Sequence, residues 1–210
     1  ENTLKKNGKY KKRFIRQDAE EKFNIQVADR VYLSNTYKDK IFKEIRKSEL
    51  GEQKYLYSGL SFFLFPTIIE NLSGQSYETF LAENIYRRLG AWELLFHPRS
   101  VFPGSRIVPT EYDSLFRKQL VHGYVHDEGA ALMGAYAGNA GLFASSNDLL
   151  KLIEMYRRMG NYGGEQIISA QAVSAGTNAL IYPVPLTAAQ GATTFARFRI
   201  SSVGVSSSAV

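Results

Sequence analysis

The strongest constraint on the fold is an almost uninterrupted apolar stretch at residues 58–72, which has polar residues on both sides. Its large apolar side chains include Phe62, Phe63, Leu64, Phe65, Ile68 and Ile69. Residues of these types are most often found in protein interiors, so the stretch predicts a buried helix of the core. Pro66 is expected at the start of this helix or at a kink within it, because proline disrupts a helix interior.

Polar caps and periodic apolar residues predict several further elements. Phe23–Val27 alternates apolar and polar residues, as a short strand does. Residues 35–45 suit a helix with its N-cap at Asn35 or Thr36. Two more helices are expected, one after Ser76 that ends near Gly90 and one after Ser145, and a turn is expected at residues 161–164.

The composition is that of an ordinary globular protein. The 210 residues are 44% hydrophobic and 22% charged, enough for one domain with a core, with or without a tail. No apolar run reaches the roughly 18 residues of a membrane span, and no signal peptide is visible at the start. The absence of cysteine excludes disulfides, thiol catalysis and cysteine-ligated zinc, but it does not fix the compartment.

The net charge of +6 raises the question of nucleic-acid binding. The basic residues concentrate in the first 54 positions, where acidic residues are interleaved with them. This mixture is typical of a solvated surface, and no nucleic-acid-binding motif accompanies it. The chain is therefore expected not to bind nucleic acid.

The composition divides the chain into three zones. Residues 1–54 form a basic lead-in, and residues 55–173 carry the strongest patterns. Residues 174–210 contain no acidic residue and no lysine, which favours a tail, a linker or a fusion segment, although a cloning or reading-frame artefact is a further alternative. Within this third zone Phe195–Ile200 suits one strand.

Several motifs occur in the order that one enzyme superfamily uses. Residues 55–62, with Tyr57 and Ser58, resemble the motif Tyr-Ser-Asn or Tyr-Ser-Asp that leads into an apolar helix. Residues 69–75, 83–90 and 140–149 resemble later segments of that superfamily, as do residues 106–111 together with 122–127. The ordered set is similar to the penicillin-recognising serine hydrolases, which include β-lactamases and DD-peptidases. Residues 106–111 together with 122–127 resemble more narrowly the β-lactamase-like modules that Bacteroidetes-type bacteria often fuse to family 3 glycoside hydrolases.

The resemblance implies an α+β fold, a helix-rich fragment of the β-lactamase/transpeptidase fold. It also implies acyl transfer on an ester or amide substrate, small or derived from the cell wall, without cofactor or metal. Tyr57 is the catalytic residue expected from it, because the tyrosine of this motif helps to move the proton. The residues expected to bind substrate are Ser58, Glu111, His122, Tyr124, His126 and Asp127.

The chain departs from the superfamily's pattern at decisive positions. No serine has a lysine three residues later, so the nucleophile motif Ser-x-x-Lys is absent. No Lys-Thr-Gly or His-x-Gly segment follows residue 149. Gly59 replaces the usual Asn or Asp, Ser61 replaces a usual Gly, and Asn139 stands where the fused modules commonly have His. A fragment cut at both ends, beginning after the nucleophile, is the simplest explanation.

Alternative interpretations of the same residues stay open. His122 and His126 are four apart and would share a face if helical, as zinc ligands do, although Gly123 favours an extended or turning segment. Glu111 and Asp113 suggest a glycosidase pair, which requires carboxylates about 5–10 Å apart across a cleft. The chain is thus a truncated serine hydrolase, a non-catalytic binding or structural remnant, or a hydrolase with a relocated site. A homodimer and a periplasmic or other extracytoplasmic location are expected.

Overall fold

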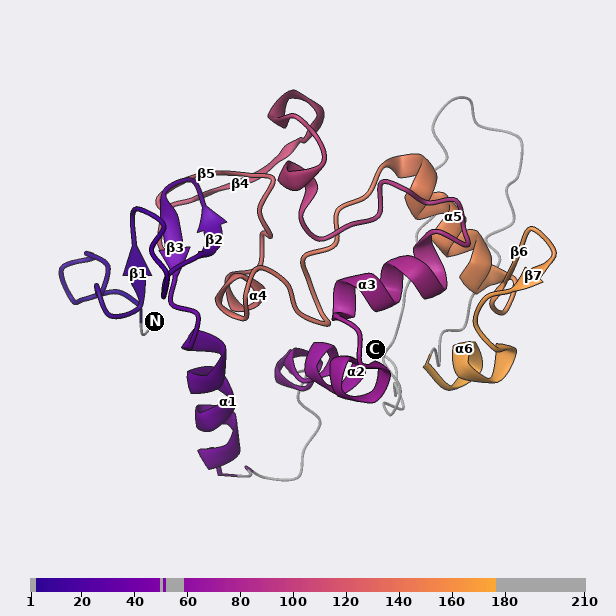
Figure 1. Ribbon diagram of the computed structural model, residues 1–210, viewed down its shortest axis with the longest axis horizontal. Coiled ribbons are helices and arrows are strands. Elements are labelled where there is room, and N and C mark those ends of the chain that lie inside the picture. The colour runs from indigo at the N-terminus through magenta and orange to yellow at the C-terminus, as the bar shows by residue number, and fades with distance from the viewer. Residues whose placement is uncertain (1–2, 50, 52–58, 177–210) are drawn as a thin grey trace, which may run out of the picture.

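The protein combines helices with short antiparallel strands in a computed structural model, which describes residues 3–49, 51 and 59–176 (Figure 1). The sequence-based prediction of an α+β fold is confirmed. The expected strand Phe195–Ile200 and the site residues Tyr57 and Ser58 lie outside the described residues.

The N-terminal part of the chain forms a three-stranded sheet and one helix. Strands β1 (Ile15–Arg16), β2 (Ile25–Ala28) and β3 (Val31–Leu33) are antiparallel in the order β1-β3-β2. The strand predicted at Phe23–Val27 is β2, two residues further on. Helix α1 (Tyr37–Lys47) follows Thr36, one of the two N-caps predicted. Apolar side chains from all four elements are buried in the first of two hydrophobic core clusters.

The apolar stretch at residues 58–72 forms two short elements instead of one helix. Its described part begins with the 3-10 helix η1 (Leu60–Phe63), and helix α2 (Phe65–Ser73) follows with Pro66 in its first turn, as predicted. The prediction that this helix is buried is wrong. Phe63 and Pro66 are buried, but the side chain of Phe65 is 43% exposed and that of Leu72 is 84% exposed. The described residues cover only one side of α2.

Helix α3 continues the chain after a sharp stop. Gly74 ends α2 with a left-handed backbone, φ +70°, which glycine adopts without strain. The predicted cap at Ser76 is confirmed, because its Oγ accepts the amide of Thr79 at 3.2 Å. From there α3 (Tyr77–Leu81) runs into the π-helical turn η2 (Ala82–Tyr86).

The middle part of the sequence forms a β-hairpin and a short helix. Two 3-10 turns, η3 (Pro98–Ser100) and η4 (Gly104–Arg106), lead into the hairpin of β4 (Pro109–Asp113) and β5 (Gln119–His122). Helix α4 (Glu128–Leu132) follows the hairpin and packs in the first core cluster with the N-terminal sheet. Figure 1 shows β4 and β5 beside this sheet, with α4 below.

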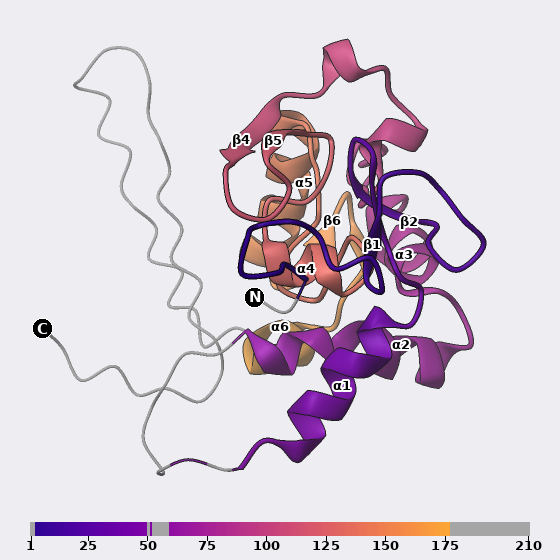
Figure 2. The same ribbon diagram turned by 90° about the vertical axis from the view of Figure 1, so that its left-hand side faces the viewer.

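The last described elements are a helix and a hairpin that pack with the end of α3 and with η2 in a second core cluster, and a final short helix. They are α5 (Ser146–Arg157), the hairpin β6 (Asn161–Tyr162) and β7 (Glu165–Gln166), and α6 (Ala170–Gly176) (Figure 2). The predicted cap at Ser145 and the predicted turn at residues 161–164 are both confirmed. Met155 of α5 is completely buried in this cluster. Among the described residues, no helix is long and apolar enough to cross a membrane.

An alanine substitution at Gly160 tests how closely the end of α5 approaches the segment that follows the β6–β7 hairpin. A Cβ added at Gly160 would lie 1.8 Å from the carbonyl oxygen of Ile168, whereas a Cβ added at Gly163 would meet nothing within 4 Å. Both glycines have positive φ, so each alanine variant carries a backbone cost of about 1–2 kcal/mol. We expect Gly160→Ala to lose about 1–3 kcal/mol more than Gly163→Ala in urea unfolding, because only Gly160→Ala adds a clash. Equal losses would contradict this close approach.

Candidate functional site

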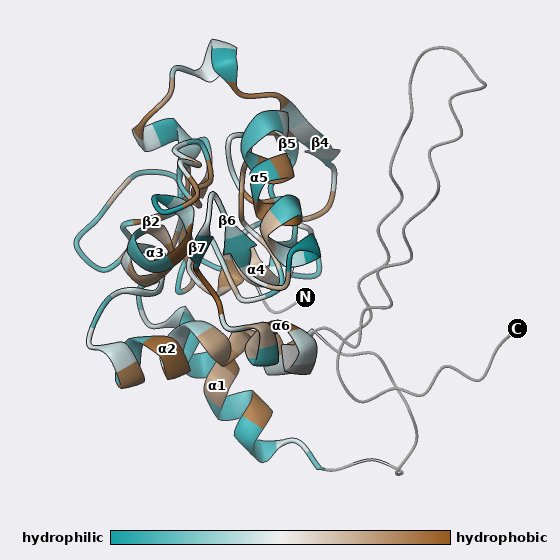
Figure 3. Ribbon diagram, turned by 90° about the vertical axis from the view of Figure 1, so that its right-hand side faces the viewer, coloured by the Kyte–Doolittle hydropathy of each residue, from teal (hydrophilic) through white to brown (hydrophobic). Residues whose placement is uncertain are grey.

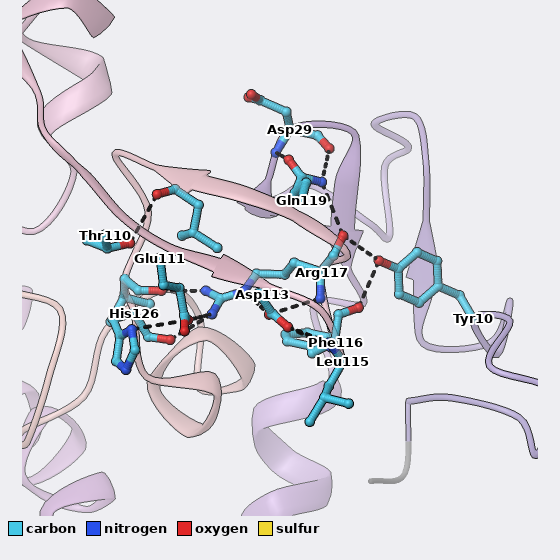
Figure 4. A network of polar contacts seen from close by, with 12 residues as sticks. Tyr10, Asp29, Thr110, Glu111, Asp113, Leu115, Phe116, Arg117, Gln119 and His126 are labelled. Carbon is cyan, nitrogen blue, oxygen red and sulfur yellow. Dashed lines mark hydrogen bonds and ion pairs between the residues drawn. The ribbon is translucent and has the colours of Figure 1, made fainter.

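Arg117, in the turn between β4 and β5, is the most buried charged residue described, with 1% of its surface exposed. Its guanidinium donates to Asp113 Oδ2 at 2.6 Å and to Glu111 Oε1 at 3.0 Å (Figure 4). It also donates to the carbonyl of Val125 and to that of His126, the latter at 2.7 Å. The guanidinium of arginine is planar and carries several N–H donors in fixed directions, which suits a site with several acceptors. Arg117 therefore fixes the hairpin to the segment that leads into α4.

Asp113 completes this arrangement from the same strand. Its carboxylate also accepts the amides of Leu115, Phe116 and Arg117 at 3.0, 2.8 and 3.0 Å. Burial raises the pKa of Asp113, but the bonds from Arg117 and these amides outweigh burial, so the net pKa lies below its ordinary 3.8. Because the folded-state pKa is depressed, the contribution to stability is fully present above pH 3.8. It is lost as the pH falls through the folded-state value.

Glu111 and His126 are the two predicted site residues that the structure brings into contact. Glu111 Oε1 lies 3.1 Å from His126 Nδ1 and 3.0 Å from Arg117. The Glu111 side chain is partly buried, and the His126 ring is 67% exposed. A carboxylate held by a buried cation thus orients an exposed imidazole, which presents its other nitrogen for hydrogen bonding.

The other predicted residues point to different partners. His122 Nε2 lies 2.6 Å from the carbonyl oxygen of Ile107. The Tyr124 hydroxyl donates to Asp29 Oδ1 at 3.0 Å, which ties the hairpin region to the N-terminal sheet. Burial and this bond raise the pKa of Tyr124 above its ordinary value. Asp127 is the N-cap of α4, where its Oδ1 accepts the amide of Ala130 at 2.6 Å.

These contacts bear on the two alternative sites. The rings of His122 and His126 are held by different partners, and the described ranges contain no group of three His, Cys, Asp or Glu residues arranged to hold a metal ion. Glu111 and Asp113 both bind the Arg117 guanidinium, and the Asp113 side chain is 3% exposed. They do not face each other across an open cleft as glycosidase carboxylates do.

The tyrosine motif meets a second motif segment at Gly59, the residue that follows Tyr57 and Ser58. Residues 137–140 form a tight turn in which Ala137 N donates to Ala140 O at 3.0 Å. The amide of Gly138 in this turn donates to the carbonyl of Phe62 in η1 at 3.1 Å. Asn139 Nδ2 lies 3.4 Å from the position that a Cβ on Gly59 would occupy. Two segments almost 80 positions apart in the sequence are therefore in direct contact.

The Beta-lactamase family model matches residues 14–194 of this chain. The chain belongs to the Beta-lactamase family. The match begins inside the basic lead-in and runs beyond residue 173. It confirms the resemblance that the ordered motifs predicted, and with it descent from the serine hydrolases of this superfamily.

Similar proteins cover the chain only in part. A protein of Escherichia coli O157:H7, provisionally named D-alanyl-D-alanine carboxypeptidase, is 32% identical over 165 residues, which are 71% of this chain and 38% of that protein. A Salmonella agona protein of the same name is 27% identical over 72% of this chain. The solved structure of the octameric penicillin-binding protein homologue from Pyrococcus abyssi matches with a TM-score of 0.48 and 19% identity, over 68% of this chain and 30% of that one. The chain thus spans well under half the length of the curated relatives that it matches.

Sequence reasoning missed Arg117, the residue that organises this region. The one available signal was the spacing of Asp113 and Arg117, which lie four residues apart. That spacing is also typical of a surface ion pair, so it did not indicate burial.

Replacing Arg117 tests its role directly. We expect Arg117→Met to lose about 3–5 kcal/mol of unfolding free energy, because it leaves the Asp113 carboxylate buried without its cation. Arg87→Met is the matched control, since Arg87 pairs with Glu83 at the surface and should cost under about 1 kcal/mol. Urea denaturation measures both variants. Equal, small losses would show that the buried network is not essential.

Proposed function

We propose that this chain forms the tyrosine-motif side of the active site in a serine hydrolase of the β-lactamase, DD-peptidase or esterase type. The supporting observation is the contact between the segment after Tyr57 and the turn at residues 137–140, made by Gly138 and Phe62 at 3.1 Å. Residues 59–62 belong to the segment that resembles the Tyr-Ser motif, and the turn leads directly into residues 140–149, which resemble a later segment of the family. The convergence of two such segments in space supports a shared site.

The reaction is acyl transfer, in which a serine hydroxyl attacks the carbonyl carbon of an ester or amide and the leaving group departs with a proton. Tyr57 relays this proton. A phenol with a pKa of about 10 is a poor base without help, so Tyr57 acts with the serine and lysine of a Ser-x-x-Lys motif. That motif does not occur in these 210 residues, and we expect it from sequence outside them.

The proposed substrates are acyl-D-alanyl-D-alanine peptides of the cell wall. The class is taken from the names of the curated relatives, and Glu111 holds the imidazole of His126 in an orientation that could donate to such a substrate. Ser58, His122, Tyr124 and Asp127 remain candidate substrate contacts. A substrate in the cell wall would place the protein in the periplasm or elsewhere outside the cytoplasm.

A binding and turnover experiment tests this function. We expect the chain to bind acetyl-D-alanyl-D-alanine, but not acetyl-L-alanyl-L-alanine, in saturation-transfer NMR. It should leave nitrocefin and p-nitrophenyl esters unhydrolysed, because the nucleophile is absent. Mass spectrometry after treatment with a fluorescent penicillin should find no adduct. Equal binding of the two peptides would contradict the substrate class, and a penicillin adduct on any serine would overturn the claim about the nucleophile.

A non-catalytic binding or structural module, joined to a glycoside hydrolase in its parent protein, is the second candidate. Gly59 in place of the substrate-binding Asn or Asp favours it. The flanking gene sequence distinguishes the two functions. An upstream Ser-x-x-Lys would support the enzyme, and an adjoining glycoside hydrolase domain without that motif would support the module.

A second copy of this chain is the proposed partner for the exposed side of α2. Leu64, Phe65, Ile68 and Leu72 lie on this side, and Figure 3 shows the apolar residues of α2 in brown. Contiguous exposed apolar patches usually mark interfaces.

Solution mass measures this association. We expect the chain to behave as a dimer in light scattering at high concentration, and Ile68→Ser with Leu72→Ser to make it monomeric, because the two substitutions remove apolar contact area. Val108→Ser with Leu115→Ser is the matched control, since these side chains are 80% and 72% exposed but lie elsewhere. A monomer at every concentration would refute the dimer.

A further inference from the structure

Two departures from the family pattern lie side by side in this structure. Gly59 lacks the carboxamide or carboxylate that usually follows Tyr-Ser, and Asn139 carries a carboxamide where the fused modules commonly have a histidine. Asn139 Nδ2 lies 3.4 Å from the Cβ position of Gly59, a distance of ordinary van der Waals contact. The amide that is missing at one position is therefore present at the position that touches it.

The backbone holds Asn139 at this place. The tip of the turn at residues 137–140 is pressed against η1, where Gly138 donates to the carbonyl oxygen of Phe62. A Cβ on Gly138 would lie 2.5 Å from that oxygen, closer than packed atoms approach. Only glycine allows the turn to dock this closely, so the location of Asn139 is fixed by the turn and does not depend on its own side chain.

The carboxamide of Asn139 is available to a ligand. Asn139 is exposed, and its carboxamide makes no hydrogen bond within the described part of the chain. A carboxamide offers two donors and one acceptor, which suits the alternating groups of a peptide backbone. Gly59 leaves open the space that a side chain at position 59 would otherwise fill. The same substitution that removes one amide therefore gives the other room.

We propose that Asn139 supplies the substrate-binding amide that related enzymes carry directly after their Tyr-Ser pair. This inference rests on the proposed function, because it assigns a contact within the same site. The ligand is the peptide backbone of an acyl-D-alanyl-D-alanine substrate, which binds beside Gly59.

Peptide titration of the 210-residue chain, followed by ¹⁵N–¹H NMR, tests the assignment with acetyl-D-alanyl-D-alanine as the probe. The side-chain NH₂ signals of Asn139 should shift along the same saturation curve as the rest of the site. Asn139→Ala should raise the Kd about five- to tenfold, the usual effect of removing one hydrogen bond. Asn147→Ala is the matched control, an exposed asparagine on α5 that should leave the Kd unchanged.

A rescue variant separates binding from a structural role. Gly59→Asn added to Asn139→Ala should restore the Kd to within about twofold of the unsubstituted chain, because it returns the amide to the position used by related enzymes. Circular dichroism should show that all variants keep their fold. If Asn139→Ala binds as tightly as the unsubstituted chain, or if Gly59→Asn fails to restore binding, Asn139 does not have this role. If the unsubstituted chain shows no preference for the D,D-peptide, the proposed function fails and takes this assignment with it.

Discussion

The guanidinium of Arg117 is withdrawn from water, and a charge in that position is costly unless every donor has a partner. Asp113, Glu111 and the carbonyls of Val125 and His126 provide these partners. Replacing a whole buried ion pair by apolar residues of similar volume is often neutral, so the pairing of Arg117 with its carboxylates does not by itself explain why the charge is buried. Its effect here is geometric, because one planar group sets the distance between the hairpin and the segment before α4.

A short series of contacts connects the segment that Arg117 holds to the segment of the tyrosine motif. Asp127 follows the carbonyl that Arg117 holds, and it caps α4. The first turn of α4 packs on η1, since a Cβ on Gly129 would lie 2.8 Å from the Phe63 ring. Phe62, the residue next to Phe63, accepts a hydrogen bond from the turn at residues 137–140. A buried arginine in the hairpin is thus connected to the backbone of η1, the first described helical element after the tyrosine motif in the sequence.

Local signals in the sequence were sufficient for the helix starts and the turns. Ser76 and Ser145 each satisfy an amide three residues further on, so their role depends on neighbours within one turn. The exposure of Leu72 and the burial of Arg117 depend on residues far away in the sequence, and hydrophobicity or charge at one position does not report them. The candidate site also has features that local sequence predicts and features that depend on distant residues. Glu111 and His126 were predicted as candidates, but their contact requires the hairpin register and Arg117.

Gly59 has a different meaning once its neighbour is known. Considered alone, a glycine in place of the motif's Asn or Asp indicates a lost substrate contact. Asn139 touches the same space, and Gly138 allows its turn to approach closely, so the three residues form one constraint. A substitution at one of two touching positions changes which side chains the other can accept. The loss of a motif residue therefore cannot be equated with the loss of its chemistry until the space around it has been described.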